Sequence, residues 1–358
     1  MKKRFILYLL AGLLFPALQT GCIYEHPELT ENGEIGKDPT LVTLEANLNL
    51  NFDMPSSTAE GDALQRPETG EAPAYRHRII IEAYQNRVCT TREVIYKEFE
   101  SGAKGMSVPV SIKLHARNYE IAVWCDYVQR PDEENGVTGT EDYFYNTVSG
   151  GLASIYEAET YRGNDEYKDA FCGTADLNLE EYRDQWGKQV SLDIPMRRPV
   201  ARIQFTANDV ADFLKGIESS SISGDSFVAK LSYRDYLNMG YNVLESLPRH
   251  GLLYLSCQRA FKVEDLKPDE NFPLLFDYVF AGSDDFTSIP VTLEIWDKGE
   301  ENVLAATSFN VNCKAGHHTN ITYRFLTADP DGGISFNPDF DGQEEIEVPA
   351  RPDEDPQS

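Results

Sequence analysis

The sequence predicts an all-β protein built from antiparallel β-sandwiches, and three observations support this prediction. Apolar and polar residues alternate over many short segments, which is the period of a strand with one buried face. These segments follow one another at hairpin spacing, with few amphipathic helical stretches between them. Of the 358 residues, 41% are hydrophobic and 11% are aromatic, so the chain has enough apolar material for packed cores.

The N-terminus has the layout of an export signal. Residues 2–4 are basic and residues 5–18 form an apolar run that is too short to span a bilayer comfortably. The sequence QTGC then ends at Cys22 and resembles the lipobox of bacterial lipoproteins, with Gln19 where an ideal lipobox has leucine. We expect residues 1–21 to be a signal peptide and the Cys22 thiol to be acylated. The alternatives are an ordinary signal peptide with an incidental cysteine, or an uncleaved anchor.

The chain is strongly acidic, with 59 Asp and Glu against 32 Lys and Arg and a net charge of −27. This balance excludes a nucleic-acid binder, which needs a basic face to neutralise phosphate. Cleavage after residue 21 removes three positive charges and changes the net charge to −30. Because anionic lipids do not attract such a protein, we expect acyl chains on Cys22 to attach it to the outer membrane.

The first half of the mature chain reads as an acidic tether over 22–40 and a β-sandwich domain over 41–198. Leu44–Phe52 alternates strictly, and a polar segment rich in Pro and Gly follows it. Pro109 indicates an edge strand or a bulge. Residues 129–187 are less regular, with helical turns around Asn178–Trp186. Further strands are predicted at Arg76–Tyr84, Arg92–Phe99, Met106–Leu114 and Tyr119–Val128.

The second half reads as another β-sandwich domain over 199–348. The segment QVSLDIPMRRPVARIQFT, residues 189–206, is a strand, a proline-marked corner and another strand, and we place the domain boundary there. A helical turn is expected at Val210–Leu214. Strands are predicted at Val200–Ala207, Phe227–Tyr233, Leu252–Cys257, Phe272–Phe280, Ile289–Trp296, Leu304–Val311 and His317–Leu326.

Signatures of common enzymes and cofactor sites are absent from the sequence. There is no GxxxxGK[ST] loop, GxGxxG, GxSxG or HExxH. We therefore expect no catalytic, cofactor-binding or metal-binding residues and no enzymatic activity. His317 and His318 would point to opposite faces of a strand, and we interpret them as structural or solvent-facing. Acidic pairs are interpreted as solvated loops, and the run at 329–333 is only a weak calcium candidate.

Six cysteines stand at positions 22, 89, 125, 172, 257 and 313, with no CxxC spacing. If Cys22 is acylated, an odd five remain, and most of these lie in apolar strand-like segments. We expect buried free thiols there. The aromatic run Tyr143-Phe144-Tyr145 is either part of a core or a platform for sugar rings.

Several segments together resemble the fimbrillin-like lipoproteins of Bacteroidales, and within that group the anchor and accessory subunits. These segments are QTGC and the EHPE that follows it, RRPVARIQF at Arg197–Phe205, and the run from Lys314 to Val348, which contains GGISFNPDFDG. The resemblance implies two tandem transthyretin-like (Greek-key) β-sandwich domains. It also implies a cell-surface lipoprotein that is anchored through Cys22 and joins fimbrial subunits by strand addition, in which a donor strand satisfies an open sheet edge.

In the stalk subunits of that family, an arginine-specific protease removes the first strand. Here Arg66 precedes Pro67, and Arg76 and Arg78 lie beyond the predicted first strand, Leu41–Phe52. The chain should therefore keep both this strand and its lipid, which favours an anchor-like or accessory role.

The C-terminal region offers a candidate donor strand. It comprises Gln343, Glu344, Glu345, Ile346, Glu347 and Val348, in which the apolar residues alternate with acids. Gly333–Phe336 is a second candidate, and a frayed acidic tail is the alternative interpretation. Residues 349–358 are rich in Pro and acids and are expected to be a disordered tail.

The leading hypothesis is a non-enzymatic, lipid-anchored surface protein that acts in fimbrial anchoring, assembly or adhesion. The alternative is a glycan-binding lipoprotein of a polysaccharide-uptake system. A glycosidase or protease is a more distant third.

Overall fold

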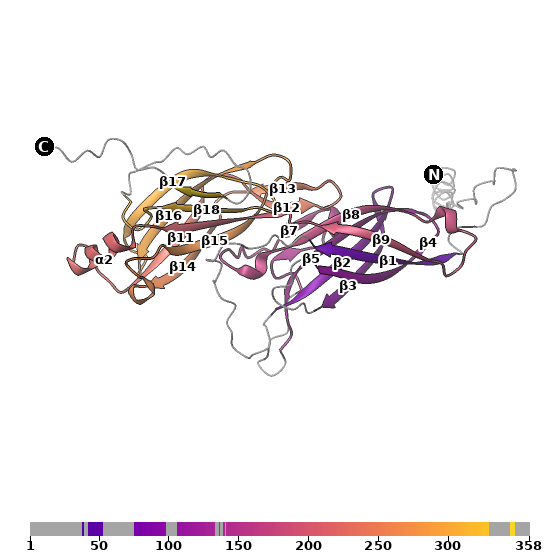
Figure 1. The fold of residues 1–358 in the computed structure, drawn as a ribbon, viewed down its shortest axis with the longest axis horizontal. Helices are drawn as coiled ribbons and strands as arrows, with labels where there is room; N and C mark the ends of the chain where they lie inside the picture. The colour runs from indigo at the N-terminus through magenta and orange to yellow at the C-terminus, as the bar shows by residue number, and fades with distance from the viewer. Residues whose placement is uncertain are drawn as a thin grey trace, which may run out of the picture. The chain divides into compact units, whose positions relative to one another are not determined.

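The computed structural model describes residue 38 and residues 42–52, 75–97, 106–132, 136, 139, 141–328 and 344–347 (Figure 1). The predicted signal peptide, Cys22, nearly all of the tether, the calcium candidate, Gly333–Phe336 and the tail lie outside these residues. No helix in the described part of the chain is long and apolar enough to cross a bilayer.

The described residues are organised mainly as strands, which confirms the predicted all-β class. Their only α-helix is α2 (Val210–Glu218), where a helical turn was expected, and short 3-10 turns make up the rest of the helical structure. The 3-10 turn η5 (Glu180–Tyr182) falls within Asn178–Trp186, where helical turns are also predicted.

Residues before position 198 supply two sheets. One has the strand order β4 (Met106–His115), β1 (Thr43–Phe52), β9 (Gln189–Met196). The other has the order β3 (Val88–Lys97), β2 (Tyr75–Gln85), β5 (Asn118–Gln129), β8 (Phe171–Asn178). β4 lies at a sheet edge, as Pro109 indicated. Phe52 of β1 packs edge-to-face on Phe171 of β8, with 5.3 Å between ring centroids.

Residues after position 198 supply two further four-stranded sheets. The first has the order β15 (Phe272–Phe280), β10 (Val200–Ala207), β18 (His318–Tyr323), β19 (Glu344–Glu347). The second has the order β14 (Ser256–Lys262), β11 (Ser226–Tyr233), β16 (Thr287–Asp297), β17 (Val303–Cys313).

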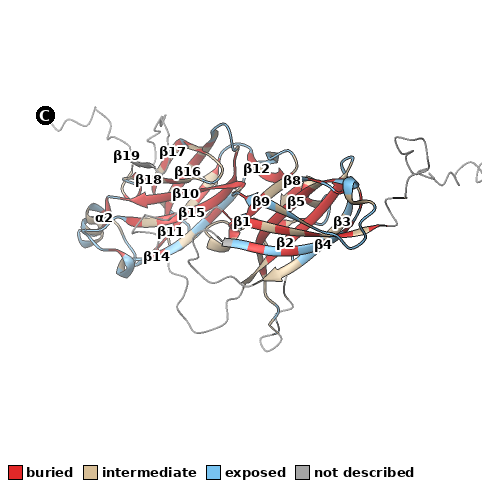
Figure 2. Ribbon diagram, turned by 45° about the vertical axis from the view of Figure 1, so that its right-hand side comes forward, coloured by how far each residue is buried: buried red, intermediate tan, exposed pale blue. Residues whose placement is uncertain are grey.

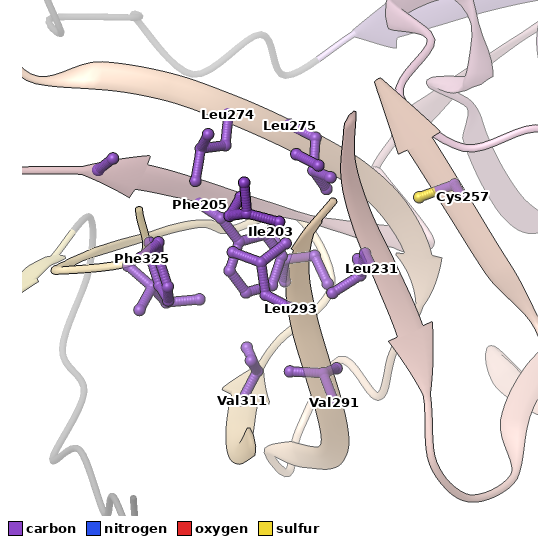
Figure 3. Packing of buried hydrophobic residues seen from close by; sticks show 14 of the residues in the cluster. Ile203, Phe205, Leu231, Cys257, Leu274, Leu275, Val291, Leu293, Val311 and Phe325 are labelled. Carbon is purple, nitrogen blue, oxygen red and sulfur yellow. The ribbon is translucent and has the colours of Figure 1, made fainter. Parts of the chain in front are cut away.

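The core of this region forms where the apolar faces of these two sheets meet. Figure 3 shows Ile203 and Phe205 of β10 pointing toward Leu231 of β11 and Leu293 of β16, and all four are buried. Every residue of β10 is buried, so this strand is red along its length in Figure 2. A strand buried on both faces is expected in the middle of a sheet, which is where β10 lies.

A fifth sheet takes strands from both sides of position 198. Its order is β13 (Leu247–Leu252), β12 (Leu237–Asn242), β7 (Ile155–Glu157), β6 (Tyr145–Asn146). A buried cluster accompanies it, in which Trp124 and Tyr145 contact Phe280 of β15. Residues from both predicted domains thus share one sheet and one apolar cluster. The domain limits themselves stay predictions.

By internal contacts the chain divides into two compact units. The smaller one contains the described residues before Asn47, with Lys113–Asn118 and Asn178–Val190. Backbone hydrogen bonds connect its three pieces, including Ala116 N–H to Val42 O at 3.1 Å and Gly187 N–H to Thr43 O at 3.1 Å. The larger unit contains Asn47–Ile112, Tyr119–Leu177 and the described residues from Ser191 onward. All of the sites discussed below lie in the larger unit.

The strand predicted at Leu252–Cys257 is wrong. β13 ends at Leu252 and β14 begins at Ser256, so the predicted strand covers the connection between them. Tyr254 lies in that connection with φ of 63°, a left-handed conformation that a strand does not allow. The sequence is apolar there, but Tyr254 is 92% exposed.

Candidate functional site

The edge of the β15-β10-β18-β19 sheet is the first candidate site. β18 pairs with β10 in parallel, from Arg202 opposite His318 to Ala207 opposite Tyr323. Ile321 in the middle of β18 is fully buried in the core of this region. Parallel neighbours of this kind must be brought together by long connections, so β18 is positioned by the fold as a whole and not by a local hairpin.

β19 covers the other side of β18. The two strands are parallel, with Thr319 opposite Glu344 and Thr322 opposite Glu347. The candidate donor segment therefore pairs with a strand of its own chain over Glu344, Glu345, Ile346 and Glu347, while Gln343 and Val348 lie outside the described residues. Without β19, β18 would present unpaired N–H and C=O groups at the edge of a three-stranded sheet.

The short length of β19 limits the stability of its pairing with β18. β18 ends at Tyr323 and β19 is only four residues long. Few ladder hydrogen bonds can form over such a length, and each contributes about 0.5–1.5 kcal/mol net. A four-residue edge strand can therefore be displaced far more easily than a central one.

A buried cluster of charged groups is the second candidate site. Lys168, at the end of the 3-10 turn η4 (Glu166–Lys168), has its Nζ 3.1 Å from Glu157 Oε2 and 3.2 Å from Asp277 Oδ1. The exposed fractions of these three side chains are 1%, 3% and 0%. Tyr233 donates a hydrogen bond to Asp277 Oδ2 at 2.7 Å, and Tyr161 donates to the same oxygen.

The electrostatics of this cluster follow from its burial. Burial raises the pKa of Glu157 to about 7, against the opposing influence of Lys168. Burial alone would lower the pKa of Lys168, but the two carboxylates outweigh it and hold that pKa above its usual value. The lysine is thus held as an ammonium between two carboxyl groups, one of which gains and loses its proton near neutral pH.

Local hydrogen bonds hold the segment Asn164–Lys168 against β15. Asn164 donates its backbone N–H to Phe276 O, and its side-chain oxygen accepts from Phe276 N–H, both at 3.1 Å. Asp165 caps η4 by accepting from Tyr167 N–H at 2.9 Å. These contacts place Lys168 beside Asp277, which lies 109 positions later in the sequence.

Sequence reasoning missed this cluster. Glu157 and Lys168 lie in the stretch interpreted as irregular, where periodicity gives no signal. Asp277 did carry a signal, because it is a single acid in the otherwise apolar strand FPLLFDYVF. A charged residue is almost never fully buried unless it is paired, so this acid required a cation that the sequence alone could not locate.

The other predicted residues have mostly structural environments. Phe144 and Tyr145 are buried in the shared apolar cluster, which leaves only Tyr143 of that run partly exposed. His317 and His318 are half-buried. Four of the five described cysteines are buried free thiols, as expected, whereas Cys89 is exposed and also free.

The comparisons with known proteins place the chain in a family. The model of a family of unknown function, DUF6562, matches residues 39–349. The chain belongs to the DUF6562 family. No curated protein matches it.

Solved structures are similar to this DUF6562 chain only at low identity. The fimbrial anchor protein Mfa2 from Porphyromonas gingivalis is 11% identical, with 74% of this chain and 81% of that chain covered and a TM-score of 0.38. A fimbrial assembly protein from Parabacteroides distasonis is 10% identical, with 78% and 91% covered and a TM-score of 0.38. Similarity of this degree carries no functional argument, so the proposals below are built on residues of this chain.

Proposed function

We propose that this DUF6562 protein is a lipid-anchored cell-surface protein that acts in fimbrial anchoring, assembly or adhesion, and that it is not an enzyme. The observation that carries the proposal is the pairing of Glu344–Glu347 on β18 at the end of a sheet. A short C-terminal strand on an otherwise open edge is the arrangement in which one subunit's strand can replace another's.

Two features of the sequence support the same proposal. The basic and apolar N-terminal segment followed by QTGC at Cys22 is typical of an exported lipoprotein. The resemblance of Arg197–Phe205 and Lys314–Val348 to fimbrillin-like lipoproteins adds the expectation of fimbrial partners. The net charge of −27 further favours a soluble, self-repelling surface protein over one that binds polyanions.

The anchoring part of the proposal is tested by replacing Cys22. In cells that make the full chain, Cys22→Ala should release the protein from the outer-membrane fraction. The matched control is Cys89→Ala, which removes an exposed thiol and should leave the protein in that fraction. The proposal fails if the Cys22→Ala protein stays in the outer membrane and captures the same partners as the wild type.

The assembly part is tested by capture of fimbrial subunits from the native bacterium. The full chain and a chain ending at Gly342 are compared as bait, and a fimbrial subunit should be recovered in amounts that depend on the removed segment. Recovery of polysaccharide-uptake proteins, or retention on glycan columns that is lost on mutating exposed aromatic residues, would instead favour the glycan-binding alternative.

A further inference from the structure

The cluster of Lys168, Asp277 and Glu157 contains a second buried acid, which a structural ion pair does not require. It contains one cation and two acids, all buried, with the lysine nitrogen within 3.2 Å of both carboxyl groups. Buried ion pairs rarely stabilise a fold more than apolar residues of similar volume would, because desolvation offsets the attraction. The second acid adds a further desolvation cost. The arrangement therefore suggests chemistry in addition to packing.

We propose that Lys168 and Asp277 become joined by an intramolecular amide bond between Nζ and Cγ, with Glu157 carrying the protons. An amine beside a carboxyl group, in a site closed to water, is the geometry in which condensation replaces hydrolysis. Holding the two groups in contact also replaces a bimolecular encounter by an intramolecular one. The link would connect residues that are 109 positions apart in the sequence.

The site is closed on the side of the carboxyl group. A methyl group placed on Gly163 would lie 2.5 Å from Cys257 Cβ and 3.0 Å from Asp277 Oδ2, so the backbone of Gly163 covers these atoms. Cys257 itself is buried, with Sγ 3.9 Å from Asp277 Oδ2. The ring of Tyr161 lies over the ammonium, with its centroid 4.1 Å from Lys168 Nζ. Contacts this close leave little volume for water around the reacting groups.

The reaction balances without any co-reactant. The Lys168 ammonium gives a proton to Glu157, which passes it to Oδ1 of Asp277, and the neutral amine then attacks Cγ of the carboxylic acid to form the C–N bond. Negative charge then develops on Oδ2, where the hydroxyls of Tyr161 and Tyr233 already donate hydrogen bonds. A second proton passes from the nitrogen through Glu157 to the Oδ1 hydroxyl, the C–O bond breaks, and one water molecule leaves.

Glu157 ends the reaction in the state in which it began. Its raised pKa of about 7 suits a group that accepts and returns a proton near neutral pH. The ammonium and the carboxylate are both consumed, so two charges disappear from the interior. No electron is transferred, and the only product besides the amide is water.

The wild-type protein itself decides the proposal by peptide mapping. The folded chain is purified, denatured and digested with trypsin, and the peptides are measured by mass spectrometry. If the amide bond forms, we expect a branched peptide in which residues 163–183 are joined to residues 263–298. Its mass should be that of the two peptides less one water, with no cleavage after Lys168. Separate peptides 163–168 and 169–183 at full mass would overturn the proposal.

Two variants test the assigned roles. Glu157→Gln keeps the shape of the side chain but cannot accept and return a proton, and we expect it to fold and to give only unlinked peptides. Lys168→Met removes the nucleophile and should also give only unlinked peptides. A branched species in Glu157→Gln would contradict the role of Glu157. If either variant fails to fold, the wild-type map still decides whether the bond exists.

Discussion

Phe280 contacts aromatic side chains from both sides of position 198. Replacing it tests whether the residues on the two sides unfold together. Its side chain is fully buried. The ring stacks on Tyr241 at 5.6 Å and also contacts Tyr145 at 5.5 Å and Trp124 at 6.5 Å between centroids. Trp124 and Tyr145 come from before position 198, whereas Tyr241 comes from after it.

The expected cost of Phe280→Ala follows from these contacts. Full burial of a phenylalanine contributes about 1.5–3 kcal/mol by transfer alone. The cavity left behind raises the cost of such a truncation to about 3–5 kcal/mol. Since whole proteins are stable by only about 5–15 kcal/mol, this is a large fraction of the total.

Urea unfolding followed by tryptophan fluorescence and by circular dichroism measures the effect. We expect one transition in the wild type, and the whole transition should move to lower urea in Phe280→Ala. Phe286→Ala is the matched control, since that ring is 48% exposed and its loss should change the free energy of unfolding by less than about 1 kcal/mol. Two separate transitions, of which only one moves, would refute the inference of a shared core.

Three further predictions concern buried charge and close packing. Because burial raises the pKa of Glu157 from 4.5 to about 7, the folded state binds more protons than the unfolded chain between these values. Stability should therefore fall as pH rises from about 4.5 to 7, by about 3 kcal/mol for this group. Glu157→Gln should remove that slope from a series of urea melts, and an unchanged slope would contradict the assignment. Arg78→Ala leaves two buried or partly buried carboxylates unpaired and should cost about 3–5 kcal/mol in the same melts. Arg87→Ala, at a side chain that is 84% exposed, should cost less than about 0.5 kcal/mol, and equal losses would refute the reasoning. Gly163→Ala should destabilise by about 1–3 kcal/mol because its methyl group has no space. Gly299→Ala, whose nearest contact is 3.5 Å away, should be nearly neutral in thermal melts, and a neutral Gly163→Ala would contradict the packing.

The strands that sequence reasoning located best are those whose side chains alternate or are uniformly apolar. β15 has the predicted bounds Phe272–Phe280, and β1 begins two residues after the predicted first strand Leu41–Phe52. Such patterns depend on burial at each position, which the residue types report directly. Tyr254 shows the limit, because its left-handed backbone interrupts an apolar run that looks continuous in the sequence.

The candidate sites could not be predicted from the sequence, because each one joins residues that are far apart along the chain. The alternation around Ile346 predicted a strand, but not that it would lie parallel to β18. The approach of Lys168 to Asp277 depends on hydrogen bonds of Asn164 to a strand more than a hundred residues later. Neither contact has a local signature, since each is set by how whole elements pack.

We propose that the β18 edge accepts a strand from another molecule, and peptide binding tests this directly. A fluorescently labelled peptide with the sequence of residues 343–348 is titrated into the full chain and into a chain ending at Gly342, and binding is followed by anisotropy. We predict saturable binding to the shortened chain and little binding to the full chain, where β19 already covers the edge. A peptide with proline in place of Ile346 cannot complete the ladder and should not bind. Absence of binding to the shortened chain, or equal binding of the proline peptide, would contradict the claim.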